Sequence, residues 1–478
     1  MFIATMKPWK LALVAVLAFA LRAWHLGARS LWLDEGVSIG LARMSWHEFA
    51  RALYTREANM SLYYLLLRGW ARLGDSEFFL RLPSVICGTA AVVIFTIFVA
   101  RLLGQKVAFI TGLLLSVSVL HIRYTRELRS YGVLILLLAL SWLVYERAVK
   151  KGDSRSLLLW ALVSAAAIYA HFFASLIIAA QLLCLLFAGL SRERLVRFIG
   201  AAVLISIIAL PLLFFVVYTK ANPLSWVAPL NASGLYWFFA EFANGGVAQV
   251  TFALLLFTAS TWLLLRSRKE ERWALSIAVL GTALPIVLVA LISLRQPAFL
   301  SRYLIVALPN FLLAIAIPIA RLPRTTSAIV LVGIVVLGFP MLRDFYSEPA
   351  WNDFRDATTY VSQHAKPGDV MLVWEPLARP AVDYYARRSR EFPAVLFPGN
   401  PGELTAADLD ARPAVADIDR ISEAYPRVWV LYASSAEPEH YNVWLTFFAR
   451  RMAMHHKLEG RFETPGFPGT QVLEYVRR

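Results

Sequence analysis

Two adjacent carboxylic acids, Asp34 and Glu35, follow a short apolar run, Leu31-Trp32-Leu33, near the start of the sequence. Partial burial at a membrane surface and the proximity of a like charge both raise the pKa of a carboxyl group, and a carboxylate with a raised pKa is a better general base. The pair therefore indicates a base that removes a proton from a hydroxyl group. The alternative is an exposed loop in which an acid caps a helix N-terminus.

A second group of polar residues lies in the segment 121–131, which reads HIRYTRELRSY. Guanidinium groups bind phosphate through two parallel, charge-assisted hydrogen bonds, so three arginines in this short segment predict a phosphate-binding loop. The alternative is that these arginines extend toward lipid headgroups. The candidate site residues of this loop are Arg123, Arg126, Glu127, Arg129 and Tyr131.

Two further candidates stand at the ends of apolar segments. His171 follows Ile168-Tyr169-Ala170, and the pair Arg302-Tyr303 begins a late apolar run. A single histidine at such a place is more often a hydrogen-bonded structural residue than a ligand, and an arginine there can simply anchor to lipid headgroups. We include all three as candidates for binding a phosphate-bearing lipid.

The elements that would position these residues are membrane-spanning helices. Of the 478 residues 59% are hydrophobic and 17% are charged, whereas soluble domains are about 45–50% apolar and about 25% charged. The excess falls in blocks of roughly 17–23 residues, which suffice to cross ~30 Å of hydrocarbon as helices. We expect about eleven transmembrane helices, near residues 9–26, 82–100, 106–122, 130–148, 156–170, 172–190, 198–218, 248–266, 273–293, 303–320 and 325–342.

The net charge of +15 comes from short basic clusters between alternate apolar blocks, such as 147–155, 192–197 and 266–272. Such clusters mark cytoplasmic loops, so we expect a cytoplasmic N-terminus, an extracytoplasmic C-terminus and no nucleic-acid partner. All candidate residues then fall on the extracytoplasmic side of what we expect to be a bacterial cytoplasmic (inner) membrane. The stretch 61–73 is short and contains two arginines, which favours a helix at the interface.

The last part of the chain has a different composition. Residues 346–478 are charged, rich in proline and without a spanning block, so we divide the chain into a transmembrane catalytic domain, 1–345, and a small extracytoplasmic α/β domain, 346–478. Apolar runs predict strands, and longer stretches between them predict helices. The expected strands are Val370–Trp374, Val428–Tyr432 and Gln471–Val476, and the expected helices are Trp351–His364 and Pro380–Arg388.

The N-terminal runs LRAWHLG (21–27) and SLWLDEGVS (30–38) resemble the first span and first outer loop of bacterial glycosyltransferase family 39 membrane proteins. These are relatives of the protein O-mannosyltransferases and of the aminoarabinose transferases that act on lipid A, and they share the GT-C fold. The resemblance continues through LYYLLL (62–67), FLRLPS (79–84), the loop 124–131 and RYL (302–304), and covers roughly residues 20–310.

The resemblance implies an enzyme that moves a sugar from a polyprenyl-phosphate donor to an acceptor at the outer face, with inversion at the anomeric carbon. It implies that Asp34 is the catalytic base, that Glu35 places it or pairs with an arginine, and that Glu127 is the second acidic position. By charge, we select Arg126, Arg129 and Arg302 for the lipid phosphate.

The sequence departs from the family pattern at one place. Many relatives have His-Pro-Pro or Lys-Pro-Pro before the Leu-Tyr-Tyr run, where this chain has Asn59-Met60-Ser61. Asn59 and Tyr63 are kept as substrate-binding candidates, whereas a phosphate or metal contact at this position is in doubt. Because members of this fold differ in metal use, the question whether the protein needs a divalent metal stays open. No Gly-rich phosphate loop occurs, so we expect no nucleotide cofactor.

Three other functions remain alternatives. A ligase or polymerase of polyprenyl-linked glycans would need the same lipid phosphate site, and a transporter or flippase would also need many spans, although transporters usually place ionisable residues near mid-membrane. A noncatalytic membrane scaffold is the third. The sugar is not defined by the sequence, and the acceptor could be a protein, a lipid or a glycan.

Overall fold

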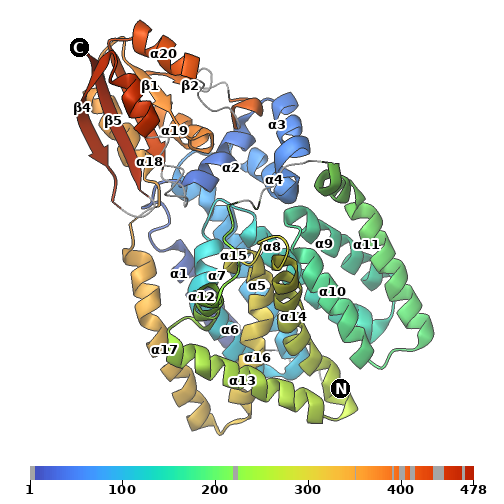
Figure 1. Cartoon of the computed structure of the whole chain (residues 1–478). Helices are drawn as coiled ribbons and strands as arrows, with labels where there is room; N and C mark the ends of the chain where they lie inside the picture. The colour runs from blue at the N-terminus through green and yellow to red at the C-terminus, as the bar shows by residue number, and fades with distance from the viewer. Residues whose placement is uncertain are drawn as a thin grey trace. The chain divides into compact units, whose positions relative to one another are not determined.

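The computed structural model of the chain describes residues 6–218, 224, 226–349, 351–389, 392–397, 404–409, 415–433, 446–465 and 469–478 (Figure 1). By contacts the chain forms two compact units. Unit 1 comprises Met1–Trp24, Ala58–Tyr63 and Arg81–Ser347, and unit 2 comprises His25–Glu57, Tyr64–Leu80 and Glu348–Arg478. Two segments of the N-terminal region thus belong with the C-terminal residues. The domain limits expected from the sequence stay a prediction.

Unit 1 is built of helices. They are α1 (Pro8–Ala23), α5 (Glu77–Leu103, from Arg81 onward), α6 (Gln105–Val117), α7 (Val119–Tyr124), α8 (Tyr131–Lys151), α9 (Ser154–Ala170), α10 (Ala174–Cys184), α11 (Arg192–Tyr218), α12 (Ala232–Ala243), α13 (Val247–Arg266), α14 (Lys269–Ser293), α15 (Ser301–Leu304), α16 (Leu308–Arg321) and α17 (Arg324–Ser347).

Among the described residues, seven helical segments are long and apolar enough to cross a membrane. They are Glu77–Leu103, Tyr131–Lys151, Arg192–Phe215, Val247–Arg266, Glu271–Ser293, Ser301–Arg321 and Arg324–Ser347. The predicted helical, multi-pass membrane protein is therefore confirmed. The predicted count of about eleven is larger, because four of the expected spans are shorter helices: α1, α6, α9 and the segment Ala174–Phe187.

A local break explains one of these differences. The expected span 106–122 is divided at Ser118, whose backbone is extended and whose hydroxyl accepts a hydrogen bond from the N–H of His121. Serine is a preferred N-cap, so it ends α6 and begins α7. Hydropathy alone does not register such a cap, and it therefore merges two helices into one span.

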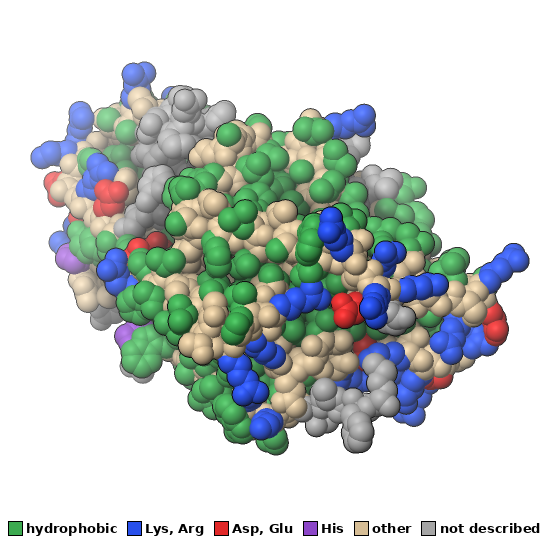
Figure 2. All heavy atoms as spheres, turned by 90° about the horizontal axis from the view of Figure 1, so that it is seen from below, with side chains coloured by type: hydrophobic (Ala, Val, Ile, Leu, Met, Phe, Trp, Pro, Cys, Tyr) green, Lys and Arg blue, Asp and Glu red, His purple; other side chains and the backbone are tan. Residues whose placement is uncertain are grey.

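The spanning helices of unit 1 differ in how much of each helix is buried. In the spanning window of Ser301–Arg321 83% of the residues are buried, whereas in that of Arg324–Ser347 only 11% are. The second helix exposes large apolar side chains, among them Val332, Val336 and Leu337. Exposed apolar residues on a spanning helix suit contact with lipid. Figure 2 shows hydrophobic side chains over much of the face seen from below, with Lys and Arg side chains gathered among them.

The helices α8 and α9 form an antiparallel pair joined at Gly152 (Figure 1). At that end of α8, the buried Glu146 pairs with Arg101 at 2.9 Å and with Lys150 at 2.5 Å. The other end of α8 begins at Tyr131, about 30 Å away at 1.5 Å per residue. The basic residues expected in the cytoplasm and the candidate residue Tyr131 thus stand at opposite ends of one helix. Which end faces the cytoplasm stays a prediction.

Unit 2 contains a five-stranded mixed sheet with the order β2-β1-β3-β5-β4. Strand β1 runs parallel to β2 and β3, whereas β5 runs antiparallel to β3 and β4. The elements are α2 (Leu33–Arg43), α3 (Trp46–Ala52), α4 (Ser61–Trp70, from Tyr64 onward), α18 (Phe354–His364), β1 (Val370–Val373), α19 (Arg379–Ala386), β2 (Ala394–Phe397), α20 (Val415–Ala424), β3 (Arg427–Ala433), β4 (His456–Glu463) and β5 (Thr470–Arg477).

The predicted small α/β domain is confirmed as a mixed sheet with helices, and its three expected strands correspond to β1, β3 and β5. The alternation of Val428, Val430 and Tyr432 places these side chains in one core cluster. Strand β4 was not expected, because its residues are mostly exposed and charged. Such composition is typical of an edge strand that resists pairing with other chains.

Candidate active site

The first turn of α2 contains both carboxylates predicted from the sequence. Asp34 is half-buried, and Glu35 is 1% exposed. A carboxylate oxygen of Glu35 accepts a hydrogen bond from the N–H of Trp32 at 3.4 Å, which reaches back to the residue before the helix. A glutamate at this position satisfies a backbone donor that the helix itself leaves unpaired. Glu35 therefore stabilises the turn on which Asp34 stands.

The helix α2 packs very closely against α19, and two glycines make this approach feasible. A Cβ atom added at Gly36 would lie 2.5 Å from the Cβ of Ala381, and one at Gly40 would lie 2.7 Å from the Cβ of Pro380. Because glycine has no Cβ, the two backbones come together without a clash. The spacing of four residues between these glycines is the signal in the sequence for this contact, which was not among the predicted features.

The segment before α2 is also fixed within unit 2. The hydroxyl of Tyr385 accepts a hydrogen bond from the N–H of Leu31 at 2.8 Å, and burial raises the pKa of Tyr385 to about 12. The guanidinium of Arg355 donates to the carbonyl oxygens of residues 27, 28 and 29 and pairs with Glu77 at 3.0 Å. Residues of α18 and α19 thus hold the segment that leads into α2 and Asp34.

Unit 1 brings a second set of predicted residues together around His171, which is fully buried. The ring of His171 lies 5.9 Å from the ring of Tyr131 and 5.7 Å from that of Tyr303. The amide nitrogen of Asn59 lies 3.3 Å from Nε2 of His171, and its amide oxygen accepts from the N–H of Phe172 at 2.9 Å. The end of α9, the start of α8 and the short helix α15 therefore meet here.

Two of the candidate arginines belong to this cluster. The charges of Arg129 and Arg302 both act on the His171 ring and on the Tyr131 hydroxyl. The Arg302 guanidinium lies over the Trp226 ring, 4.5 Å from its centroid, and over the Tyr303 ring. Stacking on aromatic rings orients a guanidinium while leaving its edge able to donate. We call Asn59, Arg129, Tyr131, His171, Arg302 and Tyr303 the arginine–aromatic cluster.

The remaining candidates of the second loop have other surroundings. Arg126 donates to the carbonyl oxygen of Trp24 at 2.5 Å and lies over the rings of Phe345 and Tyr346 at the end of α17. Arg123 pairs with Glu241 at 3.9 Å. These contacts link residues 123–126 to the end of α1, to α12 and to α17, which favours a structural role for both arginines.

Two other predicted site residues, Glu127 and Tyr63, are not part of the arginine–aromatic cluster. Glu127 is half-buried, and its carboxylate acts electrostatically on Tyr124 and Tyr131. Tyr63 is 3% exposed at the start of α4. Within the described part of the chain, no group of three or more His, Cys, Asp or Glu side chains is placed to hold a metal ion.

A buried network in unit 1 was not assigned a role from the sequence. Arg22, in α1, is fully buried, donates to the carbonyl oxygens of Ala18 and Leu115 and to the Thr125 hydroxyl, and lies 2.8 Å from Nδ1 of His121. A charged residue inside an apolar span is costly unless it has partners, which was the available signal. This network ties α1 to α6 and α7, and thereby fixes the start of the second loop.

Comparisons with known proteins agree with this architecture. Residues 60–218 match the sequence model of the family described as dolichyl-phosphate-mannose-protein mannosyltransferase. The structure is similar to that of ArnT from Cupriavidus metallidurans bound to undecaprenyl phosphate, with a TM-score of 0.61, 13% identity and 97% of each chain covered. It is also similar to the oligosaccharyltransferase of Archaeoglobus fulgidus, with a TM-score of 0.54, 9% identity, and 98% of this chain and 73% of that chain covered.

No curated protein sequence matches the chain. At these identities the structural likeness shows the fold, and the family match supplies the sequence relationship over about a third of the chain. The resemblance noted from the sequence is thus confirmed, together with the enzyme class that it implies. Residues 60–218 carry the sequence pattern of the dolichyl-phosphate-mannose-protein mannosyltransferase family, and the chain as a whole is a multi-pass membrane glycosyltransferase with an ArnT-like GT-C fold.

Proposed function

We propose that this protein transfers a sugar from a polyprenyl-phosphate donor to a hydroxyl group of an acceptor, at the extracytoplasmic face of a bacterial cytoplasmic membrane. The observation that carries the proposal is the geometry of the arginine–aromatic cluster. The buried His171 ring lies 5.9 Å from the Tyr131 ring and 5.7 Å from the Tyr303 ring, and Arg302 stacks 4.5 Å from the centroid of the Trp226 ring. Two guanidinium groups at the ends of membrane helices suit a lipid phosphate. The similar fold of ArnT, whose structure contains undecaprenyl phosphate, supports this choice of donor.

In the proposed reaction the Asp34 carboxylate accepts the proton of the acceptor hydroxyl. The hydroxyl oxygen then attacks the anomeric carbon from the face opposite the phosphate, so that the configuration inverts. The bond between the anomeric carbon and the phosphate oxygen breaks, and its electron pair leaves with the polyprenyl phosphate. Arg129 and Arg302 stabilise the negative charge that develops there. Asp34 belongs to unit 2, and the two arginines belong to unit 1.

The first prediction tests the base. Asp34→Asn removes the proton acceptor with little change in shape, so we expect transfer to fall by about 10²–10⁴-fold. The measurement uses the purified protein in lipid nanodiscs with a radiolabelled polyprenyl-phosphate sugar and an extract of cell-envelope acceptors. Asp356→Asn, which changes an exposed carboxylate on α18, is the matched control and should keep full activity.

Near-normal turnover in Asp34→Asn would remove Asp34 from the role of base. The same assay separates the alternative functions. A transferase releases polyprenyl phosphate and labels an acceptor, whereas a transporter or flippase moves the donor across the membrane intact. A ligase or polymerase would consume only donors that carry a preassembled glycan.

A further inference from the structure

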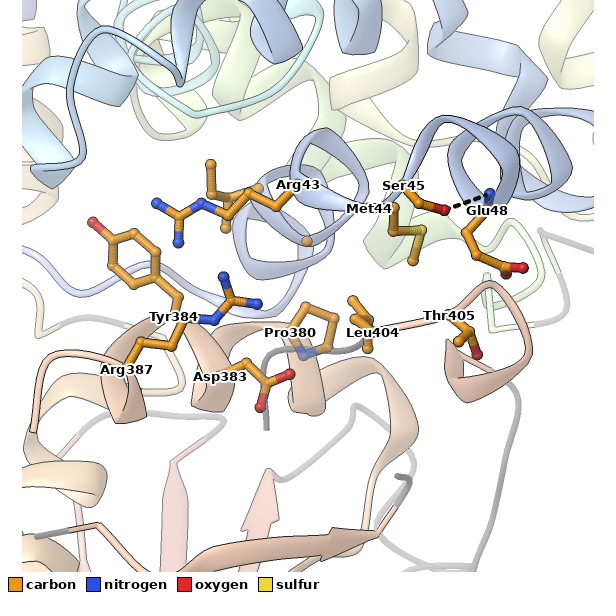
Figure 3. A pocket seen from close by; sticks show the side chains of 12 residues that line it. Arg43, Met44, Ser45, Glu48, Pro380, Asp383, Tyr384, Arg387, Leu404 and Thr405 are labelled. Atoms are coloured by element: carbon orange, nitrogen blue, oxygen red, sulfur yellow. Dashed lines mark hydrogen bonds between the residues drawn. The ribbon is translucent and has the colours of Figure 1, made fainter. Parts of the chain in front are cut away.

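Unit 2 contains a pocket of about 280 Å³ that the proposed reaction does not use. It lies between α2 and α19, beside residues 404 and 405 (Figure 3). In Figure 3 the guanidinium groups of Arg43, the last residue of α2, and of Arg387, the residue after α19, lie in the space between the two helices. The volume is close to the lower end of the roughly 300–1,000 Å³ that small-molecule sites occupy.

The Asp383 carboxylate contributes a buried acceptor to this pocket. Its Oδ1 atom accepts a hydrogen bond from Nε of Arg379 at 2.8 Å, whereas its Oδ2 atom is buried and has no hydrogen-bond partner among the described residues. Asp383 is 3% exposed, and burial raises the pKa of its carboxyl group. A buried oxygen without a partner is unfavourable, and a hydrogen bond from a hydroxyl group of a ligand would offset that cost.

Arg387 contributes an unused donor on the other side. Its side chain is exposed and makes no hydrogen bond or ion pair with the described residues, although its charge acts on Asp383. Arg43 differs, because it pairs with Asp75 and lies over the Tyr384 ring. Counting partners among the described residues only, the pocket therefore offers at least one unused cationic donor and one unused anionic acceptor.

The rest of the lining excludes a strongly charged ligand. Glu48 is a second carboxylate, which disfavours a phosphate group, and the two arginines disfavour a cation. Met44, Pro380 and Leu404 provide apolar wall. Hydrogen-bond donors and acceptors next to an apolar surface suit a neutral sugar ring, which presents hydroxyl groups at its edge and C–H groups on its faces.

We propose that this pocket binds a neutral saccharide unit of the acceptor. Asp383 would accept a hydrogen bond from a sugar hydroxyl group, and Arg387 would donate to a hydroxyl or ring oxygen. The helix α2 carries Asp34 in its first turn and Arg43 in its last turn, about 13 Å apart at 1.5 Å per residue. A short oligosaccharide therefore reaches from the pocket to the base. The assignment to the acceptor, unlike saccharide binding itself, rests on the proposed function.

The test measures binding without any donor. The full chain in lipid nanodiscs is titrated against fluorescent, neutral linear oligosaccharides of two to four residues and, separately, against phosphorylated oligosaccharides and inorganic phosphate. We expect one or more neutral oligosaccharides to bind the wild type. We also expect Arg387→Ala and Asp383→Asn each to raise the Kd by about tenfold, which corresponds to ~1.4 kcal/mol.

The variants are chosen so that folding does not confuse the outcome. Arg387→Ala changes an exposed side chain, and Arg420→Ala, which changes an exposed arginine on α20, is the matched control with an unchanged Kd. The proposal is overturned if no neutral oligosaccharide binds, if Arg387→Ala binds as well as the wild type, or if phosphate displaces the sugar. Asp34→Asn should bind like the wild type, so a failure of catalysis and a failure of this site are distinguishable.

Discussion

The support of Asp34 in unit 2 and the arginine–aromatic cluster in unit 1 are held in place by different means. Asp34 stands on a helix whose backbone is pressed against α19 through Gly36 and Gly40. Arg302 is instead held by the rings of Trp226 and Tyr303. Backbone packing fixes the position of a whole helix, whereas ring stacking orients one side chain. The comparison suggests that proton transfer depends on helix placement, and donor binding on individual side chains.

The largest effect expected in unit 1 comes from Arg302→Ala. Loss of one guanidinium that stabilises the leaving phosphate should lower transfer by about 10²–10³-fold and raise the KM for the donor. Arg302→Lys should recover only part of this loss, because an ammonium group provides a point charge without the planar fork. Steady-state kinetics with a labelled polyprenyl-phosphate sugar measure both values. An unchanged donor KM in Arg302→Ala would place the phosphate elsewhere.

A smaller effect is expected from Gly36→Ala in unit 2. The added methyl group would lie 2.5 Å from Ala381, so α2 must shift, at a cost of about 1–3 kcal/mol in the free energy of unfolding. We expect a lower transfer rate with an unchanged donor KM, because Asp34 moves while the arginines do not. Thermal unfolding and kinetics measure these quantities. Gly69→Ala, where nothing lies within 4 Å of the added atom, is the control. If Gly36→Ala and Gly69→Ala lowered stability and transfer rate equally, the close packing of α2 on α19 would not be what places Asp34.

The smallest effect concerns the pH dependence of unit 2. The N–H of Ala406 donates to Glu48 at 2.8 Å, and this hydrogen bond lowers the pKa of Glu48 below its usual 4.5. Because the folded-state pKa is the lower one, the stabilisation is fully present above about pH 4.5 and is lost as the pH falls through the lowered value. Glu48→Gln should therefore unfold with less pH dependence in acid. Thermal unfolding measured at several acidic pH values checks this, with Glu423→Gln as the control. If the melting temperature of Glu48→Gln changed with pH as steeply as that of the wild type, the prediction would be contradicted.

The sequence predicted the class of fold because apolar blocks and basic clusters are properties of composition. It also grouped Tyr131, His171 and Arg302, since each stands at a helix end on the same expected side of the membrane. It did not separate Arg126 from Arg129, because the contact of Arg126 with Trp24 depends on how α1 meets the second loop. The α2–α19 contact was likewise missed, because it joins segments about 340 residues apart whose meeting depends on tertiary packing.

The buried pair of Glu146 with Arg101 has a consequence for how the protein is made. The chain emerges from the ribosome N-terminus first, so α5 with Arg101 is synthesised before α8 with Glu146. Lys150 lies on the same helix as Glu146, one turn away, and Arg101 has already been synthesised by then. The Glu146 carboxylate therefore has one cation on its own helix and meets the second as soon as α8 packs against α5.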